Sequence, residues 1–162
     1  WRKNVSLLEE DGMPGVVDYQ ADMAHSMLFT LGYNSEGDRL LPKDYDWKDR
    51  SQLDAAYKKV ADALRPWTYD FHVAQNDGTV FGSGDHEKTG RHVQATDPNG
   101  KLDVPKNAGY WLRDESGELT KKMRHICWDG CMFPNAVMTR QQTWNDVLAT
   151  MIKVRDAHGW RE

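Results

Sequence analysis

The residues best suited to chemistry lie in the run MRHICWDG, where His125 and Asp129 are four positions apart. In an extended strand alternate side chains point to opposite faces, so His125, Cys127 and Asp129 share one side. A histidine and a carboxylate on a mostly apolar side must bond to each other, to a third group or to a ligand, because unpaired burial is unfavourable. The pattern therefore predicts a pocket wall on this strand.

Asp129 is the first candidate for acid/base chemistry. A carboxylate in an apolar pocket has a raised pKa and can take a proton from a carbon next to a carbonyl, or give one to a departing hydroxyl. We expect His125 to orient Asp129 or to share the proton transfer, since an unperturbed histidine pKa of about 6.5 suits that role. A plainer interpretation stays open for both: Asp129 orders the bend at Gly130, and His125 is a packed side chain bonded to the backbone.

A second candidate pair, Asp70 and His72, lies in the stretch from 67 to 73, where apolar and polar residues alternate strictly. This alternation predicts a strand. In the simplest interpretation the polar side faces solvent. A carboxylate and a histidine on one side of a strand nonetheless make Asp70 and His72 candidate catalytic residues.

Aromatic side chains with a polar tip are candidates for substrate contact, because they combine apolar area with hydrogen bonding. Tyr19 illustrates the alternatives, since it is either a hydroxyl donor to an oxyanion or a core residue. The candidate substrate-binding residues are Tyr19, Tyr33, Trp47, Tyr110, Trp111 and Cys127.

The two cysteines, Cys127 and Cys131, are expected to be reduced thiols. On one face of a regular strand they lie about 13 Å apart, which is too far for a disulfide. Structural zinc sites take their cysteines from turns with C-x2-C spacing, which is absent here. We therefore expect no metal site, and a cytoplasmic protein.

Length and charge limit the function classes. A chain of 162 residues fits one domain, and no apolar run approaches the length of a membrane helix. The net charge of -4 argues against nucleic-acid binding, which needs a concentrated basic surface. We expect neither a nucleic acid nor a membrane as a partner.

Helical and strand periodicities suggest an α+β order of elements, with helices covering an antiparallel sheet. Glycines at 82 and 84 interrupt a return strand and suggest strong curvature of the sheet. The expected elements are a polar arm over 1–14, helices over 16–31, 51–64 and 139–158, a hairpin from 67 to about 90, and a second hairpin from 108 to 133.

Three stretches carry a more specific pattern: YNSEGDRLLPKDYDW, NDGTVFGSGDHEKTGR and YWLRDESGELTKKMRHICWD. They resemble the segment after the first helix, the hairpin and the final hairpin of the SnoaL-like branch of the NTF2-like superfamily. The resemblance implies a single domain over 1–162. Its fold is an NTF2-like cone, a strongly curved antiparallel sheet wrapped on the N-terminal helices, with an added C-terminal helix.

The same resemblance implies a cofactor-independent lyase, isomerase or cyclase, in the manner of polyketide cyclases, ketosteroid isomerases and dehydratases. Its substrate would be a small hydrophobic molecule, carbonyl-bearing or polycyclic, in an enclosed pocket. Members often form homodimers through the convex face of the sheet. The alternative is a non-catalytic small-molecule binding or assembly module with the same fold, because fold alone does not decide function.

Overall fold

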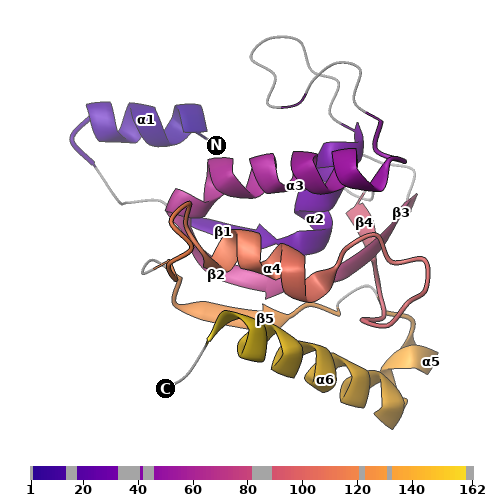
Figure 1. Cartoon of the computed structure of the whole chain (residues 1–162). Helices are drawn as coiled ribbons and strands as arrows, with labels where there is room; N and C mark the ends of the chain where they lie inside the picture. Colours follow the sequence, from indigo (N-terminus) through magenta and orange to yellow (C-terminus); the bar gives the residue numbers. More distant parts are fainter. Residues whose placement is uncertain are drawn as a thin grey trace.

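The computed structural model describes residues 2–13, 18–32, 41, 46–81, 89–120, 123–130 and 133–159, which form a mixed α/β fold (Figure 1). Helices surround two small sheets. The elements are α1 (Arg2–Glu10), β1 (Tyr19–Asp22), α2 (Met23–Gly32), α3 (Arg50–Leu64), the 3-10 turn η1 (Arg65–Trp67), β2 (Thr68–Val73), β3 (Gln75–Phe81), β4 (Thr89–Val93), α4 (Val104–Leu112), β5 (His125–Trp128), α5 (Asn135–Met138) and α6 (Gln141–His158).

The larger sheet has β2 in its centre, with β1 on one side and β5 on the other. Both neighbours run parallel to β2, whereas β3 and β4 form a separate antiparallel pair. The expected single antiparallel sheet is therefore wrong in strand direction, and β2 does not form a hairpin with β3. The sheets formed by the described residues are neither closed nor strongly curled.

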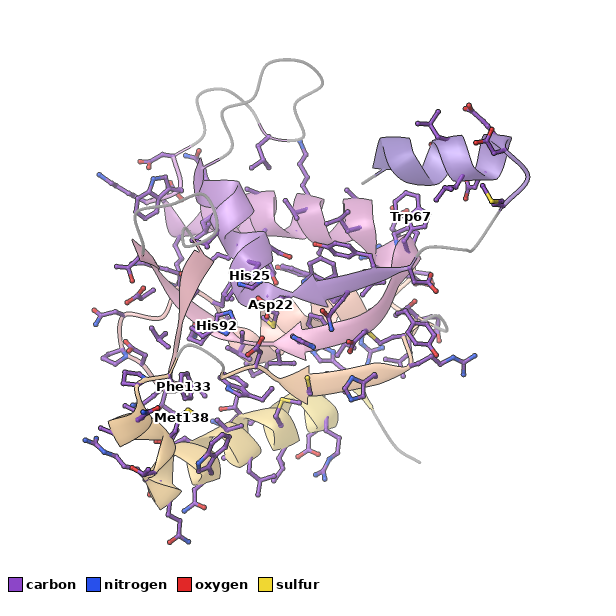
Figure 2. All side chains as sticks on the ribbon, turned by 180° about the vertical axis from the view of Figure 1, so that it is seen from behind. Asp22, His25, Trp67, His92, Phe133 and Met138 are labelled. Carbon is purple, nitrogen blue, oxygen red and sulfur yellow. The ribbon has the colours of Figure 1, made fainter. Side chains whose placement is uncertain are left out.

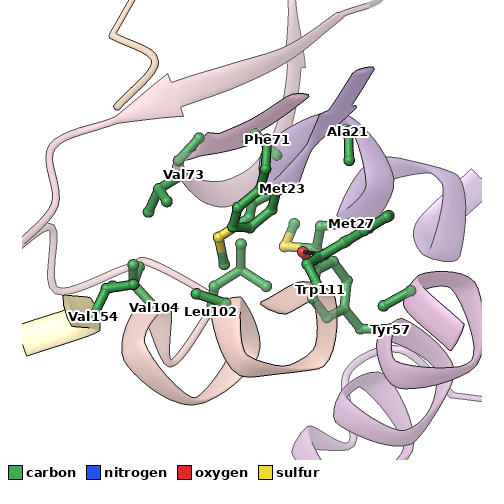
Figure 3. Close-up of a cluster of buried hydrophobic side chains, with 14 of the residues drawn as sticks. Ala21, Met23, Met27, Tyr57, Phe71, Val73, Leu102, Val104, Trp111 and Val154 are labelled. Atoms are coloured by element: carbon green, nitrogen blue, oxygen red, sulfur yellow. Dashed lines mark hydrogen bonds between the residues drawn. The ribbon is translucent and has the colours of Figure 1, made fainter. Parts of the chain in front are cut away.

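The apolar face of the larger sheet packs against the helices (Figure 3). Phe71 of β2 stacks on Trp111 of α4, with ring centroids 5.8 Å apart. Trp111 is fully buried and donates a hydrogen bond from Nε1 to the Tyr57 hydroxyl of α3 at 2.8 Å. Trp111 is thus a core residue, and its expected place in a substrate pocket is wrong.

Helix α3 forms where its periodicity predicts it. Asp49 accepts hydrogen bonds from the backbone N–H groups of Ser51 and Gln52 and is therefore the N-cap, two residues before the expected start of the helix. The apolar stripe that includes Leu53 and Tyr57 is buried.

Helix α6 also agrees with its expected span, and Gly159 ends it with a φ of 71° in the left-handed region. The expected polar arm contains helix α1, which lies apart from the other elements in Figure 1. None of the described helices has the length and apolar content that a membrane-crossing helix needs.

Two expected elements have a different structure. The helix expected over 16–31 begins only at Met23, because the four residues of β1 precede it. The strand expected to begin at 108 is part of α4, which Asp103 starts by accepting a hydrogen bond from the Lys106 N–H. Pro105 occupies the first turn of α4, where proline favours a helix. Among the described residues the expected hairpin over 108–133 is replaced by α4, an isolated antiparallel bridge between Arg113 and Leu119, and β5, which pairs with β2.

Candidate metal centre

The face of the larger sheet opposite Phe71 and Val73 is polar. Side chains alternate along each strand, and the parallel register aligns those that share this face into rows. The rows consist of Gln20, Asp70 and His125, and of Asp22, His72 and Cys127. The face therefore carries histidines and carboxylates from three strands side by side.

The second row lies at the carboxyl ends of the parallel strands, where ligands commonly bind in open α/β sheets. Asp22 is the last residue of β1, His72 is the penultimate residue of β2, and Asp129 directly follows β5. Helix α2 adds His25 from its first turn, and β4 adds His92. Figure 2 shows Asp22, His25 and His92 close together.

Asp22 is at the centre of this cluster and is only 7% exposed. Its Oδ1 accepts a hydrogen bond from the backbone N–H of His25 at 2.8 Å. The same oxygen lies 3.6 Å from His25 Nδ1 and 3.6 Å from His92 Nε2. Its Oδ2 lies 3.9 Å from His72 Nδ1, is buried, and receives no hydrogen bond from the described residues.

Asp129 lies on the other side of the histidines. Its Oδ1 is 3.4 Å from His92 Nδ1, and its Oδ2 is 3.3 Å from His72 Nδ1. His92, which is almost completely buried, thus has a carboxylate at each ring nitrogen. Burial lowers the pKa of His92, but Asp22 and Asp129 favour the protonated ring more strongly, so the pKa is raised.

Asp70 organises the outer row. It accepts a hydrogen bond from His125 Nδ1 at 2.7 Å and another from the Gln20 amide at 2.5 Å. Partial burial raises the pKa of Asp70. The two hydrogen bonds and the nearby histidines lower this pKa by more, so the net pKa lies below its usual value. Asp70 Oδ2 also lies 3.6 Å from His72 Nε2. The other nitrogen of this ring, Nδ1, faces Asp129.

The carboxylate-to-histidine contacts of the cluster are longer than ordinary charge-assisted hydrogen bonds. Such bonds are about 2.7–2.9 Å long, whereas the contacts of Asp22 and Asp129 to histidine nitrogens are 3.3–3.9 Å. The contact between His72 Nδ1 and Asp129 Oδ2, at 3.3 Å, is a long hydrogen bond. Ligand atoms around a tetrahedral zinc ion, with bonds of about 2.0–2.1 Å, lie about 3.4 Å apart. The cluster contains two sets of three residues whose donor atoms lie within 4.8 Å of one another. The first set is Asp22, His25 and His92, and the second set is Asp22, His72 and Asp129.

Of the expected catalytic residues, His72 and Asp129 come together, and so do His125 and Asp70. The shared face of His125 and Asp129 is confirmed by their contacts to β2. However, His125 pairs with Asp70 instead of Asp129, and its side chain is 63% exposed. The expectation of an apolar pocket wall around His125 is therefore wrong, because this face of the sheet is its polar one.

The expected substrate-binding residues are scattered over the fold. Tyr19 is half-buried at the start of β1, where burial raises the pKa of its hydroxyl. Trp47 packs against the core just before α3. Tyr110 donates from its hydroxyl to Asp54 of α3 at 2.8 Å. Tyr33 lies outside the described residues.

Among these residues only Cys127 lies on the polar face, opposite His72 in the register. Burial and the surrounding carboxylates raise the pKa of its thiol, which disfavours the thiolate that nucleophilic catalysis needs. Two hollows of about 460 and 750 Å³ lie elsewhere, one along α3 and α4 and the other near Arg113 and His158. Neither hollow is lined by the expected catalytic residues.

Sequence reasoning missed Asp22, His25 and His92. The spacing Asp-x-x-His at 22 to 25 looks like one helical surface, but a strand ends at Asp22 and turns the carboxylate towards β2. His92 lies in the short strand TGRHV, whose alternation could have marked it. The chain matches no protein-family model, no curated protein and no solved structure.

Proposed function

We propose that this protein is a metal-dependent hydrolytic enzyme whose divalent ion is held by Asp22, His25 and His92. The carrying observation is the buried Oδ1 of Asp22 between two imidazole nitrogens, each at 3.6 Å. Two histidines and one carboxylate are a donor set of catalytic zinc sites, which keep a further position open for water. The sequence led us to expect no metal site, but the geometry of these three residues favours one.

The surroundings of the three ligands support a catalytic ion. His25 is about half exposed, so the open position faces solvent. Asp129 lies behind His92, in the carboxylate–histidine–metal arrangement that fixes the ring and raises its basicity. A divalent ion held by Asp22, His25 and His92 would supply a water activated near neutral pH for hydrolysis of an ester or phosphoester bond.

Metal binding provides the first test. Metal-free protein is titrated with Zn²⁺ by calorimetry, and bound metal is counted by mass spectrometry after dialysis. We expect Asp22→Asn and His92→Gln to weaken binding at least tenfold. Asp156, exposed on α6, belongs to neither donor set, so Asp156→Asn is the matched control and should bind as the unaltered chain does. Circular dichroism establishes that each variant is folded.

Hydrolysis provides the second test, with p-nitrophenyl acetate and bis(p-nitrophenyl) phosphate as probes. Turnover should disappear with a chelator and return with Zn²⁺. Failure of the unaltered chain to bind Zn²⁺, Co²⁺ or Mn²⁺, or equal affinity in folded Asp22→Asn, would overturn the proposal.

A cofactor-independent acid/base enzyme of the SnoaL-like kind is the second candidate, favoured by the contact of His72 with Asp129 at 3.3 Å. In this case Asp129 moves a substrate proton, His72 assists it, and the substrate is a small carbonyl-bearing molecule. The NTF2-like cone and the homodimer belong to this candidate. Turnover that survives a chelator but not Asp129→Asn would favour it. Binding of a small molecule without turnover would favour the non-catalytic module.

A further inference from the structure

We infer that the site takes a second divalent ion, bridged to the first by the carboxylate of Asp22. This inference rests on the proposed function, because it assigns a second position to the same cluster. The second ion is held by Asp22 Oδ2, His72 Nδ1 and Asp129 Oδ2.

The two oxygens of Asp22 face different partners. Oδ1 is near His25 and His92, whereas Oδ2 is near His72. A carboxylate whose oxygens point at separate donor sets can bridge two ions, as in the two-metal sites of hydrolytic enzymes. A single ion on the Oδ1 side would leave the second set, Asp22 Oδ2, His72 and Asp129, without an ion.

The Oδ2 atom supplies an independent observation. It is buried and accepts no hydrogen bond from the described residues, although buried carboxylate oxygens almost always have a partner. His72 Nδ1, at 3.9 Å, is too distant for a hydrogen bond. An ion between Asp22 Oδ2, His72 Nδ1 and Asp129 Oδ2 gives this oxygen the positive partner that it lacks.

The outer nitrogens of the ligand rings complete the argument. His92 Nδ1 faces Asp129 at 3.4 Å, whereas His72 Nε2 lies 3.1 Å from the Gln20 amide nitrogen and 3.6 Å from Asp70. In metal sites a carboxylate behind the second nitrogen holds the ring in the ligating tautomer. His92 of the first donor set has such a carboxylate in contact, and His72 of the second set has Asp70 close by, next to the Gln20 amide. Asp129 serves both sets, because its Oδ1 supports His92 while its Oδ2 belongs to the second set.

The number of ions per chain tests this inference. Metal-free protein is titrated with Mn²⁺ by calorimetry, and bound Mn²⁺ is counted after dialysis. We expect two ions for the unaltered chain and for the control Asp156→Asn, and one ion for His72→Gln. Electron paramagnetic resonance of the Mn²⁺-loaded chain should show an exchange-coupled pair, which His72→Gln lacks.

The possible outcomes separate the two proposals. One Mn²⁺ ion per unaltered chain overturns the two-ion inference and leaves the proposed function standing. No bound ion overturns both. Two ions in folded His72→Gln overturn the assignment of His72 as a ligand.

Discussion

Asp22 is the last residue of β1, and α2 begins at the next residue. The backbone N–H of His25 holds Oδ1 of the carboxylate, so the orientation of Asp22 is fixed by the main chain. Oδ2 then points across the sheet towards His72. The proposed ligand set is therefore pre-organised at its centre, because the protein itself fixes this carboxylate.

Asp70 is expected to tune the second ion without touching it. Asp70→Asn removes the negative charge behind His72 Nε2, and loss of such a partner typically weakens metal binding about 10- to 100-fold. The affinity for the first ion, which His72 does not hold, should stay within about twofold by the same reasoning. Calorimetric titration with Mn²⁺ measures both affinities.

Asp156→Asn, at an exposed position on α6, is the matched control for Asp70→Asn. It removes a carboxylate from a region remote in sequence and topology from the donor sets. Unchanged affinity for both ions in Asp70→Asn would show that Asp70 has no role in positioning His72.

At the scale of elements, α4 and α6 are in contact where Gly109 faces His158. A Cβ at position 109 would lie 2.5 Å from His158 Cε1. The ring cannot move freely, because its Nε2 is 2.6 Å from the carbonyl of Pro105 and its Nδ1 accepts a hydrogen bond from Arg113. The close approach of these helices therefore depends on glycine.

Gly109→Ala should destabilise the fold although alanine is the better helix former. The helix gains about 1 kcal/mol from the substitution, whereas overpacking costs about 1–3 kcal/mol. Urea unfolding measures the difference. In a His158→Ala background the obstacle is gone, so Gly109→Ala should there be neutral or stabilising. An equal loss of stability in both backgrounds would show that the contact with His158 is not the cause.

Apolar periodicity in the sequence predicted those helices and strands that depend mainly on residues close together in the chain. Helices α3 and α6 and strand β2 follow their apolar periodicity. The strand predicted from 108 is instead helix α4, because Asp103 and Pro105 start a helix just before it. Strand direction could not be predicted, since parallel pairing depends on distant crossovers and not on the residues of a strand.

The same division applies to the site. Alternation placed Asp70 with His72, and His125 with Asp129, on shared faces. Which residues meet across strands depends on the register, which places Asp70 opposite His125. His92 reaches the cluster from the second sheet, and no local pattern in the sequence indicates that approach.

At the scale of the whole molecule, both pairings of the larger sheet join distant parts of the chain. Tyr19 pairs with Thr68, and Asp70 pairs with His125. Each pairing closes a loop of about fifty residues, which is entropically unfavourable until other contacts form. Topologies dominated by such pairings fold slowly, whereas helices form early from local contacts.

Refolding should therefore occur in a defined order. Pulse-labelling hydrogen exchange, read by mass spectrometry, should show protection of amides in α3 and α6 before protection of amides in β1, β2 and β5. Simultaneous protection of helices and strands would contradict this order.

This parallel arrangement ties the donor atoms to the final step of folding. Asp22, His72 and Asp129 belong to three different strand ends, and they adjoin only when β1 and β5 are both paired with β2. A folding intermediate with its helices formed and its sheet open therefore lacks this second donor set, whereas the set of Asp22, His25 and His92 does not depend on these two pairings. In the two-ion proposal the second ion is captured last in folding, and opening of the sheet releases it.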